Sequence, residues 1–268
     1  MTTISYRTSP VLGIAKYSLA LAARLRAIRV VFVIFMLSGS SIAYGAALLA
    51  RRSSGSVNSA EVLNFCLSRG SIFVPMVGLM AVMLGARLAN GGALQLLVSI
   101  YPRKSVAVAL ISISGLGGAL LALTGVGLGV IGIGAFDTQI LTGGLGASTF
   151  LLIGRIVIVG FTVALLGMWL ALSLRSGLAS ASCWLAYALF LEPMIHGFIA
   201  VSAPNSTLSS AWMPLRAMEN FVRLNSASAE LSELLSSAEI FSSVFVCISL
   251  MLGAALTSCR LVFVSDYA

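Results

Sequence analysis

Three ionisable side chains lie inside long apolar stretches of this chain, where charged or titratable groups are unusual. They are Arg155, Glu192 and the only histidine, His196. Arg155 and Glu192 each lie about eight residues, or about 12 Å, from the nearer end of a predicted helix. Ionisable groups at that depth usually face a bundle interior and pair with one another. Two interpretations stay open: polar features of a transport pathway, or a structural ion pair between two helices, with His196 as a hydrogen-bonding neighbour of Glu192.

Other catalytic chemistry is missing from the sequence. The only lysines are Lys16 and Lys104, and neither follows a glycine as a nucleotide-binding P-loop requires. A single histidine excludes the paired-histidine metal motifs, and the four cysteines form no C-x-x-C pair. No G-x-S-x-G with a second histidine-bearing segment supports a serine hydrolase. We therefore predict that this chain is not an enzyme and holds no metal or cofactor.

The helices that carry Arg155, Glu192 and His196 are predicted from the long uncharged blocks of the sequence. Hydrophobic residues make up 59% of the 268 residues and charged residues only 9%, against about a quarter in soluble domains. Six long blocks contain no Asp, Glu, Lys or Arg, and the shorter ones reach the length of about 20 residues that a membrane-spanning helix needs once weakly polar flanks are included. The β-strands of a membrane barrel are shorter and alternate in polarity. The sequence predicts an all-α membrane protein with six transmembrane helices.

The predicted elements form a single transmembrane domain over residues 1–268. An N-terminal interfacial helix occupies 11–29, a cytoplasmic helical segment 88–104, and an extracellular helical loop 201–238. The predicted transmembrane helices are 30–50, 68–87, 106–130, 147–174, 177–200 and 239–260.

The orientation follows from the distribution of basic residues. With a cytoplasmic N-terminus, the inside segments hold ten Lys or Arg and one acid, whereas the outside segments hold five Arg and six acids. Basic residues in short loops favour the cytoplasmic side, so we predict a multi-pass protein of the cell membrane with both termini in the cytoplasm. The net charge of +8 is therefore explained by membrane topology and does not indicate nucleic acid as a partner.

Three segments leave a choice between interpretations or add a detail to the topology. Residues 11–29 are amphipathic, which favours a helix in the membrane interface with its bulky face in lipid; the alternative is a cytoplasmic extension of the first span.

The glycines of 125–134 favour close helix packing, and the alternative is a broken or re-entrant element at the outer face. In the last loop, Pro214 is predicted to open a helix whose apolar face, including Met218 and Val222, lies on the membrane interface.

The segment 88–104 is too apolar for an ordinary connecting loop. It reads Leu-Ala-Asn-Gly-Gly-Ala-Leu-Gln-Leu-Leu-Val-Ser-Ile-Tyr-Pro-Arg-Lys, a flexible start, a helical stretch and a Pro-Arg-Lys stop. A short apolar helix at the cytoplasmic surface needs something to pack against.

The chain resembles the membrane subunit of type-2 ABC transporters in two respects. One is this order of elements, and the other is the stretch Gly91-Gly92-Ala93-Leu94-Gln95-Leu96-Leu97-Val98-Ser99 followed by Pro102-Arg103. The stretch is similar to the family's Gly-Thr-Leu-x-x-Leu-Leu with following Pro and Arg, which forms the coupling helix. Two departures are Arg87, where the family often has an acid, and Gly92 in place of Thr.

The resemblance implies a permease of an exporter for a peptide, drug, lipid or other amphipathic cargo. ATP and Mg would be bound by two copies of a separate ATPase subunit, and a second copy of this chain or a homologous permease would complete the complex among membrane lipids. It assigns contact with the ATPase to a set of residues around the predicted helix, with Leu94 and Leu97 on the docking face. These residues are Arg87, Asn90, Gly91, Gly92, Leu94, Gln95, Leu97, Ile100, Pro102, Arg103 and Lys104.

Two other hypotheses compete with this one. A secondary transporter or channel would use Arg155, Glu192 and His196 for ion coupling. A membrane-embedded enzyme would need clustered catalytic groups, which the sequence lacks.

Overall fold

A computed structural model describes residues 10–26, 28–35, 37, 63, 67, 74–90, 92–136, 146–202, 212–223 and 237–264. Every regular element in these ranges is a helix, and none of them forms a strand. A helix satisfies its own backbone hydrogen bonds, which is required of any segment in contact with lipid. The all-α class predicted from the sequence is therefore confirmed.

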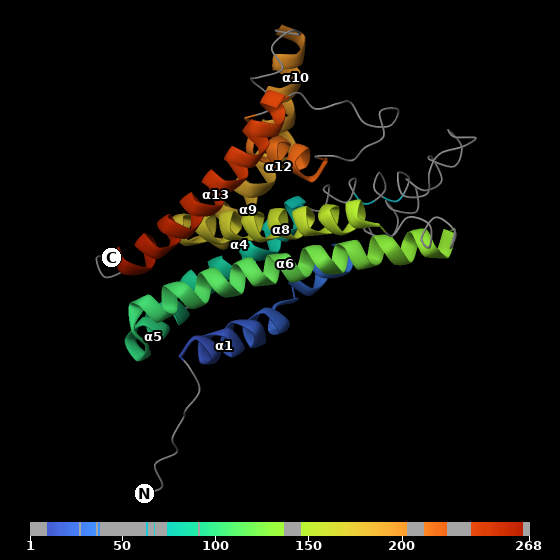
Figure 1. Ribbon diagram of the computed structural model, residues 1–268. Helices are drawn as coiled ribbons and strands as arrows, with labels where there is room; N and C mark the ends of the chain where they lie inside the picture. Colours follow the sequence, from blue (N-terminus) through green and yellow to red (C-terminus); the bar gives the residue numbers. More distant parts are fainter. Residues whose placement is uncertain are drawn as a thin grey trace, which may run out of the picture.

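The helices extend across the described chain in the arrangement of Figure 1. In chain order they are α1 (Pro10–Arg24), α4 (Val74–Asn90), α5 (Ala93–Ile100), α6 (Arg103–Phe136), α8 (Ala147–Leu174), α9 (Gly177–Ala186), the π-helical turn η2 (Tyr187–Leu191), α10 (Glu192–Ser202), α12 (Pro214–Arg223) and α13 (Ser237–Val264).

Among the described residues, four stretches are long and apolar enough to cross a membrane, judged by length and composition: Arg103–Ala135, Ala147–Leu174, Gly177–Ile199 and Phe241–Val262. A fifth is added if Pro75–Asn90 and Ala93–Ile100, which meet at 69°, count as one bent span. This is a multi-pass membrane protein. Most of the predicted first span, 30–50, lies outside the described residues, so six spans stay a prediction.

The predicted boundaries hold best in the second half of the chain. The predicted span 147–174 matches α8, and 177–200 lies within the helical run from α9 to α10. Between them, Arg175 turns the chain with a positive φ of 49°, and the Ser176 hydroxyl accepts a hydrogen bond from the Ala179 amide at 3.4 Å. The chain therefore makes a tight turn at Arg175 and Ser176.

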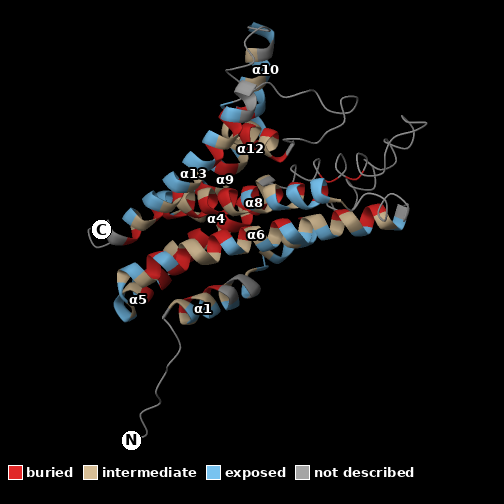
Figure 2. Cartoon of the chain, in the orientation of Figure 1, coloured by how far each residue is buried: buried red, intermediate tan, exposed pale blue. Residues whose placement is uncertain are grey.

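Helix α8 lies at the centre and packs on its neighbours through small residues. A Cβ atom built on Gly160 would stand 2.7 Å from the Gly118 carbonyl oxygen of α6, and one on Gly167 would stand 3.1 Å from the Ala81 Cβ of α4. The backbones approach this closely only because side chains are absent there, which is how membrane helices gain packing contact. Figure 2 shows the buried residues concentrated where α4, α6 and α8 meet.

The span predicted for 106–130 is extended at both ends, and the alternative of a break at its glycines is wrong. α6 is one continuous helix from Arg103 to Phe136. Its glycines accommodate neighbours instead: the ring of Phe161 lies against Gly115, and the ring of Phe35 lies about 3.0 Å from a Cβ built on Gly125. A helix tolerates these glycines in apolar surroundings because breaking it would leave backbone groups unsatisfied.

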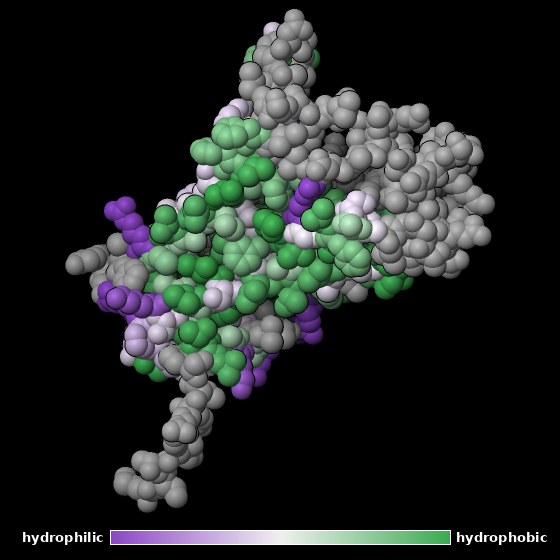
Figure 3. Space-filling view, viewed as in Figure 1, coloured by the Kyte–Doolittle hydropathy of each residue, from purple (hydrophilic) through white to green (hydrophobic). Residues whose placement is uncertain are grey.

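One end of the bundle gathers the segments predicted to be cytoplasmic. Leu88 of α4, Leu97 of α5, Leu172 of α8 and Val262 of α13 belong to one buried apolar cluster. In Figure 3 the same end carries hydrophilic side chains beside the broad hydrophobic face. The segments that the charge pattern assigns to one side of the membrane therefore lie at a common end of the molecule.

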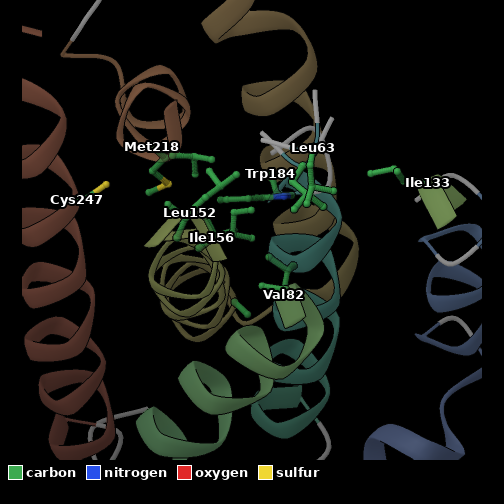
Figure 4. Close-up of a cluster of buried hydrophobic side chains, with 14 of the residues drawn as sticks. Leu63, Val82, Ile133, Leu152, Ile156, Trp184, Met218 and Cys247 are labelled. Atoms are coloured by element: carbon green, nitrogen blue, oxygen red, sulfur yellow. The ribbon is translucent and has the colours of Figure 1, made fainter. Parts of the chain in front are cut away.

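The second large cluster lies toward the opposite end. Leu152 and Ile156 of α8, Met218 of α12 and Trp184 of α9 point toward one another in Figure 4. The Trp184 indole Nε1 also donates a hydrogen bond to the Pro75 carbonyl oxygen at 2.7 Å, which ties α9 to the start of α4.

Helix α1 is shorter than the predicted 11–29 and packs on protein. It ends at Arg24, and helical conformation resumes after Leu25. Ile14 and Tyr17 both belong to the bulky face of this segment, which the sequence predicts to lie in lipid. Ile14 is instead fully buried in the cluster that includes α5 and α6, whereas Tyr17 is exposed. The prediction of a lipid-facing bulky side is wrong for Ile14, because the first turns of α6 offer it an apolar surface.

Candidate functional site

Helix α5 connects α4 to α6 at one end of the bundle. Gly92 precedes it with φ of 66°, a left-handed conformation that glycine adopts without strain. The Gly92 carbonyl oxygen accepts the Leu96 amide at 2.9 Å, and the Leu97 carbonyl oxygen accepts the Tyr101 amide at 2.9 Å. The 69° bend between α4 and α5 therefore includes Gly92, whose positive φ a glycine adopts without strain.

The two faces of α5 differ. Ala93, Leu94 and Leu97 are buried in the cluster shared with α1, α4, α6, α8 and α13. Leu96 and Ile100 are 55% and 61% exposed. The helix is thus anchored by one apolar face while it displays two large apolar side chains on the other.

This arrangement corrects the docking face expected for the segment. Leu94 and Leu97 point into the chain's own core, so they are not available to a partner. The exposed face instead carries Gln95, Leu96 and Ile100, together with Ser99, whose hydroxyl donates to the Leu96 carbonyl oxygen at 2.8 Å. Sequence spacing alone places all of these on a helix but does not say which side faces inward.

The remaining predicted coupling residues flank α5. Arg87 and Asn90 are exposed on the last turn of α4, and Pro102 and Lys104 are exposed where α6 begins. Arg103 is half-buried. Gly91 lies outside the described residues. Both flanks of the exposed face therefore carry positive charge.

Tyr101 joins α5 to α1. Its hydroxyl oxygen lies 3.1 Å from a Cβ built on Gly13, so the ring passes directly over a glycine of α1. The N-terminal helix, α5 and the start of α6 thus form one packed unit.

The second candidate centre is Glu192, far from α5 in the fold. Its side chain is only 5% exposed. One carboxylate oxygen accepts the Arg216 amide at 2.6 Å and the other accepts the Leu215 amide at 3.1 Å. Glu192 therefore caps the N-terminus of α12, where free amide groups and the helix dipole favour a negative charge.

The sequence contains a signal for this cap that its helical periodicity did not reveal. α12 opens with Pro214, and its cap position is Met213, whose carbonyl oxygen accepts the Ala217 amide at 2.7 Å. A methionine side chain cannot accept the amide hydrogen bonds that Ser, Thr, Asp or Asn accept at that position. The acceptor had to come from elsewhere in the chain, and it is Glu192.

A π-helical turn stands directly before Glu192. Residues 187–191 form η2, and π-turns inside α-helices often mark functional positions. Tyr187 lies within η2, close enough to Glu192 for the two side chains to interact electrostatically. One turn later, the buried Nδ1 of His196 has no hydrogen-bond partner among the described residues. Tyr187, Glu192 and His196 therefore follow one another along one helical run, and we call them the polar group of α10.

Arg155 is separate from this group. Its side chain is half-buried on α8, and no ion pair joins it to Glu192. The Glu192 carboxylate is instead occupied by the α12 amides. The structure thus does not bring the two predicted pathway charges together as a pair.

The apolar face of α12 also lies elsewhere than expected. Met218 and Val222 are 0% and 1% exposed and pack on α8 and α13, so the predicted contact with the membrane interface is wrong for them. On the other side, Arg216 and Glu219 form an ion pair at 3.0 Å. The helix has the expected two faces, but protein and not lipid covers the apolar one.

No protein-family model matches the chain, and a search of curated proteins finds no significant match. Its function is therefore inferred from the arrangement of its own residues.

Proposed function

We propose that this chain is the membrane-spanning permease subunit of an ATP-driven exporter of the type-2 ABC class, with ATP bound and hydrolysed by a separate subunit. The observation that carries the proposal is α5: a short helix, anchored on its inner face, that displays Leu96 and Ile100 between flanking basic residues. Large exposed apolar side chains rimmed by polar ones mark interaction sites.

The anchoring of α5 suits a coupling element. Its buried side chains Leu94 and Leu97 share a cluster with Leu110 of α6 and Leu172 of α8. Closely packed apolar clusters transmit displacement because they deform little. A push on the exposed face of α5 would therefore move α4, α6 and α8 together and change the opening between two such bundles.

The partners follow from the proposal. Two ATPase copies would each dock on one α5, and a second copy of this chain or a homologous permease would complete the pathway. ATP and Mg belong to the ATPase subunits, since this chain has no P-loop. The cargo would be amphipathic, as suits a path lined by apolar helices.

The test is co-purification with a P-loop ATPase encoded beside this chain. Leu96→Asp combined with Ile100→Asp is expected to abolish co-purification and ATP-dependent transport in proteoliposomes, while the permease itself stays folded. The matched control is Leu178→Asp, which changes an 82% exposed leucine just after the Arg175 turn. Retained association in the α5 double variant, or equal loss in the control, would contradict the coupling role of α5.

The second candidate is a secondary transporter or channel that uses Glu192 and His196 for ion coupling. It is favoured by a buried carboxylate inside a predicted span directly after a π-turn. It predicts ion flux through the chain alone in proteoliposomes, lost in Glu192→Gln. Absence of flux without an ATPase would leave the exporter proposal in place.

A further inference from the structure

Arg155 is the only charged residue of α8, a 28-residue apolar helix. The part of the chain that the structure describes offers its guanidinium no hydrogen bond and no ion pair, although the side chain is half-buried. Of the two carboxylates whose side chains are described, Glu192 accepts backbone amides of α12 and Glu219 pairs with Arg216. The charge of Arg155 is therefore not compensated by these described carboxylates.

The surface around Arg155 is apolar and open. Leu151 and Ile158, one turn to either side on the same face of α8, are 63% and 45% exposed. A Cβ atom built on the neighbouring Gly154 would meet nothing within 4 Å. An acyl chain would find both space and apolar contact here.

The depth of Arg155 places its charge within reach of lipid headgroups. At 1.5 Å per residue, α8 is about 42 Å long and Arg155 is about 12 Å from its first residue. A hydrocarbon core of about 30 Å centred on the helix would begin about 6 Å above Arg155. A long arginine side chain extends over such a distance to the interface while its stem stays in apolar surroundings.

The chemistry of the side chain selects the partner. A guanidinium stays protonated in proteins, so it cannot escape the cost of the membrane by losing its proton. It needs an anion, and its planar fork matches phosphate oxygens in a two-point contact. Adjacent exposed Leu151 and Ile158 favour an anion that carries a hydrocarbon chain.

We propose that Arg155, together with Leu151 and Ile158, binds an anionic phospholipid of the leaflet at the N-terminal end of α8. The phosphate pairs with the guanidinium, and an acyl chain lies along the exposed face of the helix past Ile158. This site is independent of α5 and of any ATPase.

The test measures lipid retention by the purified full-length chain. Delipidated protein is titrated with phosphatidylglycerol or phosphatidylcholine, and bound lipid is counted by native mass spectrometry, with thermal stabilisation as a second readout. We expect the wild-type chain to prefer phosphatidylglycerol and Arg155→Leu to bind it about tenfold more weakly, the loss expected for a charge-assisted contact.

Two further variants make the result specific. Arg155→Lys keeps the charge but not the planar fork, so we expect an intermediate affinity. Arg260→Gln changes an exposed arginine near the end of α13 and should leave retention unchanged. Leucine suits the apolar face of α8, so Arg155→Leu should fold.

Two outcomes overturn the proposal. One is equal retention of phosphatidylglycerol by wild-type and Arg155→Leu protein. The other is loss of self-association in Arg155→Leu with unchanged lipid binding, which would assign the charge to a carboxylate of a second copy of this chain.

Discussion

Helices α5 and α12 are both short, both two-faced, and attached to the bundle in opposite ways. α5 is anchored by Leu94 and Leu97 and keeps Leu96 and Ile100 on its surface. α12 buries Met218 and Val222, and its N-terminus is held by the Glu192 carboxylate. One helix displays apolar side chains, and the other hides them.

The difference teaches what each helix is suited to do. Large exposed apolar side chains rimmed by polar ones mark interaction sites, so α5 suits the docking of a partner in the proposed function. The apolar face of α12 lies on the core, and a buried carboxylate holds its N-terminal amides, so α12 suits closing one end of the bundle. Amphipathicity alone does not separate these two roles.

The largest effect is expected for a charge on the inner face of α5. Leu97→Asp would place a carboxylate among buried apolar groups, which costs several kcal/mol, and we expect loss of monodisperse protein in detergent. Ile100→Asp, at a 61% exposed position of the same helix, should leave the melting temperature almost unchanged. Similar behaviour of the two variants would show that α5 is not anchored by the Leu97 face.

The next effect concerns the clamp on α12. Glu192→Ala removes the acceptor of the Leu215 and Arg216 amides and should destabilise α12 by about 2–3 kcal/mol. Hydrogen exchange is expected to rise in peptides covering Pro214–Arg223 and to stay unchanged in α5. Glu192→Gln keeps one amide oxygen, so its exchange should be intermediate. Unaltered protection of α12 in Glu192→Ala would contradict the clamp.

A smaller effect tests the contact between α1 and α5. Gly13→Leu would push the Tyr101 ring away and should cost about 1–2 kcal/mol, as overpacking does. The same substitution in a Tyr101→Ala background should cost much less, because the colliding ring is gone. Thermal melts of the four proteins in this cycle give the coupling, and additive effects would mean that the two residues do not touch.

The smallest effect is expected for the surface ion pair of α12. Arg216 and Glu219 are 31% and 30% exposed, and such pairs contribute about 0–1 kcal/mol. Arg216→Gln should therefore shift the melting temperature far less than Glu192→Ala. If Arg216→Gln lowered the melting temperature as much as Glu192→Ala, the ion pair and not the buried carboxylate would be the main interaction that stabilises α12.

The sequence predicted most helices because their signals are local. The apolar block 147–174 coincides with α8, and the basic ends of several segments meet at one end of the bundle. The length of an uncharged block and the side of its flanking charges are properties of the neighbouring residues. They need no knowledge of the rest of the fold.

Predictions failed where contact between distant segments decides the outcome. Leu94 and Leu97 were expected to face a partner and are instead buried, because α4, α6 and α8 converge behind α5. For the glycines of α6, the favoured prediction of close packing is confirmed, because Phe161, Gly160 and Phe35 approach them, and only the alternative of a break is wrong.

Glu192 shows the same limit for a polar group. Its equal depth with Arg155 suggested a pair, yet the π-turn at 187–191 inserts an extra residue that rotates the following helix by about 100° relative to a regular count. A helical wheel drawn from sequence does not include that rotation.

By itself, the sequence determined that this chain is helical and membrane-embedded, with its basic segments together at one end, because hydropathy and charge act through each residue's own transfer between water and lipid. Only the tertiary structure decided which face of α5 is free, what holds α12, and that Arg155 and Glu192 do not pair. Those outcomes depend on which surfaces meet in the fold. Close packing depends on the shapes of both surfaces, and the sequence of one segment does not specify the shape of its partner.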